Sequence, residues 1–168
     1  MPLCEKYSHT KARFFVADFK VLIRVFGFAE KAILHGSKYD FMHENELAKI
    51  VVSAAYNIHS NLGPGLFESV YETIMEHELV TKHHLYVVRQ FPLPVTWEGA
   101  KMELGFRADL LIENKLIVEL KSIESLAPVH YKQMLTYLKL SGIKLGLLIN
   151  FNEELLKTGI KRIINGSL

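Results

Sequence analysis

The sequence lacks the features that mark secreted and membrane-spanning proteins. A single cysteine, Cys4, occurs among 168 residues, so no internal disulfide can form and a reducing, cytoplasmic setting is expected. No long uncharged apolar run is present either. The most apolar N-terminal stretch, residues 14–34, is interrupted early by Asp18 and Lys20. The sequence therefore predicts no signal peptide, no membrane-spanning helix and no membrane partner.

The sequence also has little excess charge of either sign. Its formal net charge is +2, which divides into +3 over residues 1–41 and −1 over residues 42–168. Lys and Arg contacts with phosphates supply most of the affinity of non-specific DNA-binding proteins, so a near-neutral body argues against that class. A local basic patch or a bound divalent cation would have to compensate in any protein of this composition that acts on nucleic acid.

What is present is enough apolar sequence for one folded domain. Hydrophobic residues make up 49% of the chain and charged residues 23%, which is typical of a globular domain rather than a disordered one. The character of the chain changes at Met42, after which the apolar periodicity becomes regular. We expect residues 42–168 to form the domain. Residues 1–41 are either a helical segment laid on it or an extension ahead of a true start at Met42.

The periodicity beyond Met42 predicts a mixture of helices and strands. Helices are expected over residues 44–60, 67–82 and 129–140, and a short helix is expected over residues 153–166. Strands are expected as one or two within residues 85–99, as hairpin arms at 101–112 and 115–122, and as a buried strand at 143–151. The resulting order, α-α-β-β-β-α-β-α, predicts an α/β (α+β) fold with a mixed central β-sheet flanked by helices.

The predicted hairpin carries charged residues at positions that face one another. With a three-residue turn at 113–115, Asp109 lies directly across from Glu119. The same register sets Arg107 across from Lys121, and alternation places all four on one face. The opposite face is expected to be the core and carries Phe106, Ala108, Leu110, Leu116, Val118 and Leu120.

Two opposed carboxylates indicate a metal site. Asp109 and Glu119 would repel with their Cβ atoms roughly 5 Å apart, and a hard divalent cation removes that cost. Mg²⁺ binds through one or two carboxylates together with water and substrate phosphate, and it activates water for attack. Lys121 would orient that water or neutralise the phosphate. The alternative is a solvated face whose acids are screened by Arg107 and Lys121, and a different turn length would abolish the pairing altogether.

Two helical segments add candidates. Glu68 and Tyr71 share a face on the first turn of the second helix, although Glu68 is also explained as an acid that favours the helix dipole. Gln133 and Tyr137 lie four residues apart on the third helix. Either side chain would hydrogen-bond a phosphate or a metal-bound water, and Tyr137 would alternatively stack on a base. An ordinary half-buried polar edge explains this pair equally well.

Four motifs in this order resemble a known family. They are LGPGLFESVY (62–71), FRADLLIENKLIVELKS (106–122), LAPVHYKQMLTYLKLSG (126–142) and LGLLINFN (145–152). Together they are similar to the GxxExxY proteins of the PD-(D/E)XK nuclease superfamily. The resemblance covers about three quarters of the chain, leaves out residues 1–41, and implies a restriction-endonuclease-like core.

The resemblance also implies roles for individual residues. Metal ligands would be Glu68, Asp109, Glu119 and the backbone carbonyl of Leu120, and Lys121 would be the catalytic lysine. Gln133 and Tyr137 resemble the Q-x-x-x-Y motif of the RecB-like branch, which contacts substrate, and Arg107 is a further candidate for substrate binding. Ala108 replaces the proline of the signature, which carries no chemistry. His59 and His130 lie near these motifs and are more simply explained as surface or capping residues.

The leading hypothesis is therefore a nuclease that depends on Mg²⁺ or Mn²⁺ and hydrolyses phosphodiester bonds, with DNA a better candidate than RNA. The alternative from another class is a non-catalytic module that binds nucleic acid or protein and retains the nuclease fold. A third is a structural domain whose polar hairpin face is only solvated. Metal binding separates the first from the other two, and the oligomeric state is left open.

Overall fold

The computed structural model of the protein describes residues 42–102 and 105–168. The expectations for residues 1–41 lie outside the described residues. Within the described part of the chain, no helix is both long enough and apolar enough to cross a membrane.

The domain is built on one mixed sheet. Its helices are α3 (Glu44–Leu62), α4 (Glu68–Thr81), α5 (Pro128–Ser141) and the short α6 (Leu156–Gly159). Its strands are β1 (Val87–Leu93), β2 (Thr96–Trp97), β3 (Ala100–Lys101), β4 (Phe106–Ile112), β5 (Leu116–Lys121), β6 (Leu145–Asn150) and β7 (Ile160–Ile164). The five-stranded sheet has the order β1-β4-β5-β6-β7, and β2 pairs only with β3. Strands β5 and β6 are parallel and the other neighbours are antiparallel, so the predicted mixed sheet is confirmed.

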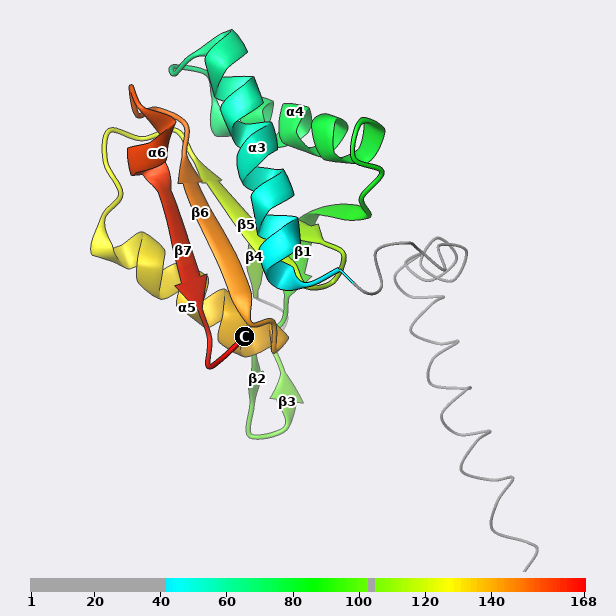
Figure 1. The fold of residues 1–168 in the computed structure, drawn as a ribbon. Coiled ribbons are helices and arrows are strands. Elements are labelled where there is room, and N and C mark those ends of the chain that lie inside the picture. Colours follow the sequence, from blue (N-terminus) through cyan, green and yellow to red (C-terminus); the bar gives the residue numbers. More distant parts are fainter. Residues whose placement is uncertain (1–41, 103–104) are drawn as a thin grey trace, which may run out of the picture. The chain divides into compact units, whose positions relative to one another are not determined.

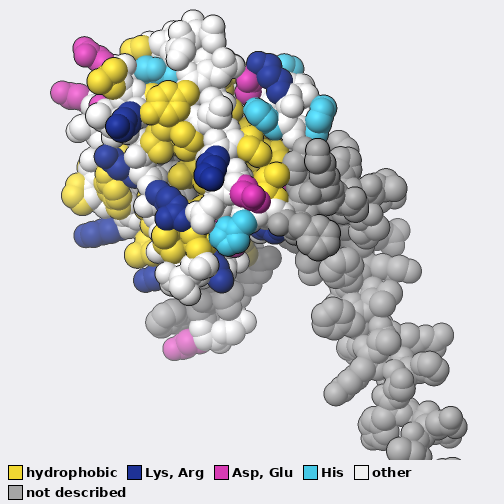
Figure 2. All heavy atoms as spheres, viewed as in Figure 1, with side chains coloured by type: hydrophobic (Ala, Val, Ile, Leu, Met, Phe, Trp, Pro, Cys, Tyr) yellow, Lys and Arg dark blue, Asp and Glu magenta, His cyan; other side chains and the backbone are white. Residues whose placement is uncertain are grey.

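The helices cover both faces of this sheet. In Figure 1, α3 passes in front of the strands and α5 lies behind them, while α4 packs against α3. Lys and Arg side chains are scattered among hydrophobic ones on the face seen in Figure 2. That face carries no continuous field of one charge, in keeping with the near-neutral composition.

Helix boundaries follow from local signals in the sequence. His43 caps α3 by accepting a hydrogen bond from the backbone N–H of Asn45, and Glu46 accepts one in return from the His43 N–H, which forms a capping box. Pro128 begins α5 and Gly142, with φ 73°, ends it, as expected from the backbone preferences of these two residues.

Both faces of the hairpin contribute to the core, and not only the face that was expected to. Leu111 and Ile117, on the face assigned to the charged residues, are buried and pack with Met134 and Leu138 of α5. The reason is that β4 and β5 are central strands with a helix layer on each side, so both of their faces are apolar over most of their length. Phe106, which we expected in the core, is instead partly exposed near the start of β4.

Two expected elements were wrong. The segment 153–166 forms only a four-residue helix and then β7, an edge strand antiparallel to β6. Three isoleucines in five residues favour a strand, and pairing with β6 outweighs the helical pattern. The expected hairpin arm 101–112 is also divided, because Lys101 pairs with Thr96 rather than continuing toward β4.

Candidate active site

The hairpin register is as predicted in the part nearest the turn. Leu110 pairs with Val118, and this is the last pair of the β4–β5 ladder toward the site. Beyond this pair, a hydrogen bond from a side chain takes the place of the backbone hydrogen bonds between the two strands. An Oδ2 atom of Asp109 accepts a hydrogen bond of 2.8 Å from the backbone N–H of Leu120. The β4–β5 ladder therefore ends before the positions where Asp109 and Glu119 were expected to face each other.

Lys121 joins the acids that the sequence placed near it. Its Nζ atom lies 2.9 Å from Oε1 of Glu119 and 3.5 Å from Oε2 of Glu68. The side chains of Lys121 and Glu119 are only 14% and 5% exposed, whereas that of Glu68 is 43% exposed. The first residue of α4 and the end of β5 thus meet in one partly buried charge cluster.

Burial dominates the electrostatics of this cluster. It raises the pKa of Asp109 to about 7, with a further contribution from the charge of Glu119 and partial relief from the Leu120 N–H and from Lys121. Burial likewise raises the pKa of Glu119, and Lys121 offsets part of that rise. For Lys121, burial acts to lower the pKa, but the neighbouring carboxylates outweigh it and the pKa is raised. The lysine therefore stays charged at neutral pH.

One buried oxygen in the cluster is left without a partner. Among the described residues, the Oε2 atom of Glu119 is the buried side-chain polar atom that no hydrogen bond satisfies, and such an atom normally costs about 1–3 kcal/mol. A cation that binds Asp109 and Glu119 would satisfy it. Two carboxylates are the usual protein contribution to a Mg²⁺ site, so the donors fit Mg²⁺ or Mn²⁺. The described residues contain no ready-made group of three or more His, Cys, Asp or Glu side chains for a metal.

Gln133 and Tyr137, which we call the α5 pair, reach the same region. Gln133 donates a hydrogen bond from Nε2 to the hydroxyl of Tyr137, as the four-residue spacing allowed. Burial raises the pKa of Tyr137, and the charge of Glu119 adds to this, so the phenol is close enough to sense the acids. Its ring is 2% exposed and packs 5.6 Å from that of Phe106. A buried ring is not available to stack on a base, so that expectation for Tyr137 is not supported.

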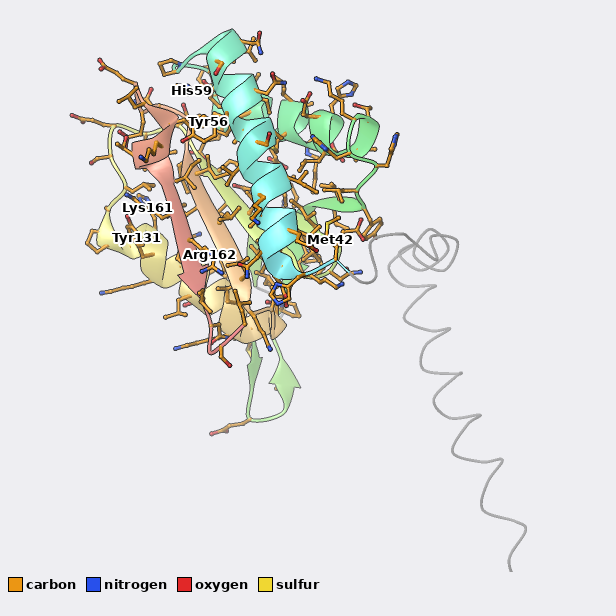
Figure 3. The ribbon with its side chains drawn as sticks, viewed as in Figure 1. Met42, Tyr56, His59, Tyr131, Lys161 and Arg162 are labelled. Atoms are coloured by element: carbon orange, nitrogen blue, oxygen red, sulfur yellow. The ribbon has the colours of Figure 1, made fainter. Side chains whose placement is uncertain are left out.

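The remaining predicted residues lie apart from the cluster. Arg107 is exposed, sits opposite Pro92 of β1 and forms no ion pair with a described acidic residue. His59, near the end of α3 (Figure 3), binds the carbonyl oxygen of Glu153 through Nε2 at 2.8 Å. His130 accepts a hydrogen bond from the backbone N–H of Ala127. The two histidines thus have structural partners, and the predicted role of the Leu120 carbonyl stays a prediction.

Sequence reasoning missed one acid beside the site. Glu72 is buried and accepts hydrogen bonds from Nε of Arg89 at 2.9 Å and from Nε2 of Gln90 at 2.8 Å. Its charge is one of the contributions that raise the pKa of Asp109. The signal was available, because Glu72 lies four residues after Glu68 and therefore on the same face of α4. No sequence signal pointed to Gln90.

Comparison with solved structures finds chains of low sequence identity to this one. This chain is similar to the crystal structure of SSO0001, with 19% sequence identity and a TM-score of 0.45. The match covers 74% of this chain and 60% of that chain. The chain is also similar to the crystal structure of an alkaline exonuclease (LHK-Exo) from Laribacter hongkongensis, with 12% sequence identity and a TM-score of 0.43. That match covers 74% of this chain and 72% of that chain. No curated protein matches the sequence.

A family model gives the stronger result. The model of the PD-(D/E)XK nuclease superfamily matches residues 45–163. That match includes both central strands, the helix that begins with Glu68 and the α5 pair. The chain therefore belongs to the PD-(D/E)XK nuclease superfamily.

Proposed function

We propose that this protein is a metal-dependent nuclease that hydrolyses phosphodiester bonds in DNA. The observation that carries the proposal is the buried, unpartnered Oε2 atom of Glu119, which lies beside Asp109 and a charged Lys121. Folding alone gains nothing from two raised-pKa carboxylates in one place. A binding site for a divalent cation explains why both carboxylates are present.

Each residue of the cluster has a distinct part in this reaction. Asp109 and Glu119 would hold Mg²⁺ or Mn²⁺, with Glu68 and the Leu120 carbonyl completing the protein ligands. When bound, the ion supplies a Lewis acid for the phosphate and lowers the pKa of a coordinated water. Lys121 keeps its charge because its pKa is raised, so its ammonium stabilises the negative charge that develops on the phosphate.

The α5 pair and Arg107 would act on the substrate rather than on the ion. The Tyr137 hydroxyl holds the amide of Gln133, so that Gln133 is oriented to donate to a phosphate oxygen. The exposed Arg107 would contact the backbone of the nucleic acid. The pairs Glu68–Tyr71 and Gln133–Tyr137 support placing the protein with the GxxExxY proteins and the RecB-like branch.

The experiment is a cleavage screen with matched variants. Wild type is incubated with linear, circular and single-stranded DNA and with RNA, in Mg²⁺ or Mn²⁺ and in EDTA. We expect metal-dependent cleavage of DNA that Asp109→Ala and Lys121→Ala abolish. The exposed Glu154→Ala and Lys157→Ala variants, purified in parallel, control for a contaminating nuclease and should cleave like wild type. Cleavage by Asp109→Ala at the wild-type rate would show that the site is assigned wrongly.

A non-catalytic binding module is the second candidate, and one observation favours it. Lys121 already contacts both Glu68 and Glu119, so these two acids are partly neutralised without an ion. Under this reading, calorimetry would detect no binding of Mg²⁺ or Mn²⁺, even with a DNA duplex present, and no substrate would be cleaved. That pair of results would replace the nuclease proposal.

A further inference from the structure

The backbone of Leu66 is held at both of its polar groups by side chains from outside its loop. Its N–H donates to the hydroxyl of Tyr71 at 3.3 Å, and its carbonyl accepts from Oγ of Ser122 at 2.6 Å. The Tyr71 hydroxyl also donates to the carbonyl of Gly63 at 2.7 Å. We call Tyr71 and Ser122 the Leu66 clamp.

The clamp is itself rigidly placed. Tyr71 is fully buried and its ring stacks on that of Phe151, with 4.2 Å between centroids and 9° between planes. Ser122 follows directly after the last residue of β5. A phenylalanine would fill the same core position as Tyr71, and a buried hydroxyl is unfavourable unless it is hydrogen-bonded. The hydroxyl of Tyr71 is therefore explained by the loop that it holds.

The clamp joins the two parts of the chain that carry the charge cluster. Leu66 lies two residues before Glu68, and Ser122 lies one residue after Lys121. The hydrogen bond between Ser122 and Leu66 thus limits how far Glu68 can move from Lys121 and Glu119. Proximity in sequence does not bring these segments together, because Leu66 and Ser122 are 56 positions apart.

The start of α4 has no side-chain cap of its own. Phe67 is its N-cap residue and makes no side-chain capping hydrogen bond, although N-cap positions normally favour Ser, Thr, Asp or Asn for that purpose. The loop before it passes through Gly63 and Gly65, with φ values of 70° and 101°, which are conformations that favour glycine. The placement of the first turn of α4, and of Glu68 on it, thus depends on contacts from outside the helix.

We infer that Tyr71 and Ser122 are positioning residues that place Glu68 to bind the metal ion. The inference rests on the proposed function, because it treats Glu68 as a metal ligand. Neither residue touches the reacting atoms. Tyr71 acts through the N–H of Leu66, in the loop that precedes Glu68, and Ser122 acts through the carbonyl of the same residue from the end of β5.

The test measures Mn²⁺ binding by calorimetry on the whole protein. Tyr71→Phe removes only the hydroxyl, and Ser122→Ala removes only the second hydrogen bond. We expect each variant to bind Mn²⁺ about tenfold more weakly than wild type, as for other residues that orient a ligand, and Ser122→Thr to restore binding. Tyr56→Phe, on α3 (Figure 3), and Ser141→Ala, which removes a 2.8 Å hydrogen bond to a carbonyl at the end of α5, are matched controls and should bind normally.

A double-mutant cycle separates positioning from general stabilisation. If Tyr71 acts through Glu68, Tyr71→Phe has no further effect on Mn²⁺ binding in a Glu68→Gln background. Hydrogen exchange of the Leu66 amide, measured without metal, should be faster in Tyr71→Phe. Circular dichroism checks that each variant is folded, and Ser122→Ala carries the test if Tyr71→Phe is not.

The possible results distinguish the two proposals. Wild-type Mn²⁺ affinity in both clamp variants would overturn the positioning role and leave the nuclease proposal standing. An equal loss with and without Glu68 would also overturn it, because the effect would not pass through that ligand. Failure of the wild type to bind Mn²⁺, even with DNA, would overturn both proposals.

Discussion

Gln90 lies opposite Asp109 across β1 and β4, at a point where the alternation of side chains on both strands is interrupted. The flanking pairs Arg89–Leu110 and Phe91–Ala108 set this register. Gln90 has φ 50°, a left-handed conformation that is uncommon for residues other than glycine.

The interruption is visible in what the neighbouring residues contact. Arg89 and Gln90 are consecutive, yet both donate to Glu72 of α4. Residues three apart on a regular strand point to opposite faces, but Ala108 and Leu111 both join the cluster packed with α5. The broken alternation on β4 falls next to Asp109 and leaves its carboxyl group where the charge of Glu72 reaches it.

A glycine should therefore be tolerated at position 90 better than an alanine. Gln90→Ala loses the hydrogen bond to Glu72 and keeps the unfavourable φ, whereas Gln90→Gly loses the same bond without that cost. We expect Gln90→Gly to have a free energy of unfolding about 1 kcal/mol higher than Gln90→Ala. Urea titration of the two variants measures the difference. Equal stabilities would show that the backbone at Gln90 is not left-handed in solution.

Removing the charge of Asp109 should stabilise the metal-free protein at alkaline pH. Folding raises the pKa of Asp109 from 3.8 to about 7. The folded state thus holds the proton more tightly, and the cost of ionisation develops as the pH rises from about 4 to about 7 and is complete above 7. The shift corresponds to about 4 kcal/mol. Asparagine still accepts a hydrogen bond from the Leu120 N–H, but this bond is weaker because its acceptor carries no charge.

We therefore expect Asp109→Asn to raise the free energy of unfolding by about 2 kcal/mol at pH 8 in EDTA. The gain should shrink as the pH falls toward 4, and denaturant titrations of both proteins across this range would measure it. Saturating Mg²⁺ should reverse the order, because only the aspartate binds the ion. A gain independent of pH would contradict the raised pKa.

The same pKa predicts how metal affinity depends on pH. A carboxyl group must lose its proton to bind a metal ion, so binding below pH 7 releases the proton of Asp109. We expect the dissociation constant for Mn²⁺ to fall roughly fivefold between pH 6 and pH 7 and to change little above pH 8. Calorimetry in buffers of different ionisation enthalpy counts the released protons. A flat profile would indicate that Asp109 is already ionised at pH 6.

The charge of Lys121 should matter far more to stability than that of a surface lysine. Lys121→Met keeps the aliphatic stem but leaves the buried Glu119 without its cation, and breaking a buried pair typically costs about 3–5 kcal/mol. Lys82→Met is the matched control, because Lys82 pairs with Glu78 at 2.8 Å but is 59% exposed. Glu78 is only 10% exposed, but a pair whose lysine remains in water is worth at most about 1 kcal/mol.

The cost of Lys121→Met should be smaller at pH 5 than at pH 8. Glu119 without Lys121 takes up a proton more readily, because burial already raises its pKa, and a neutral carboxyl group needs no cation. Urea titrations of wild type, Lys121→Met and Lys82→Met at the two pH values measure both effects. A loss no larger than that of Lys82→Met would mean that the cluster is solvated.

Local patterns in the sequence determined much of the secondary structure and the hairpin register. Helix α3 was expected over residues 44–60 and spans Glu44–Leu62, because its apolar spacing and its ends are encoded by adjacent residues. Leu110 pairs with Val118 in the expected register for the same reason, since a short turn sets the pairing of both arms. The pairing expected for Asp109 and Glu119 lies beyond the last pair of this ladder and stays a prediction. The prediction of a helix over residues 153–166 was wrong because the local helical pattern competed with pairing to β6. The segment itself does not encode that pairing.

Only the tertiary structure decided how the acids are held. Desolvation raises the pKa of Asp109 and Glu119, and it depends on the helices that cover the sheet rather than on the neighbours of either residue in sequence. Ser122 reaches Leu66, and Gln90 reaches Glu72, through contacts between distant segments. Sequence patterns report hydrogen bonds and alternation within one element, whereas burial and long-range partners are set by the packing of elements against each other.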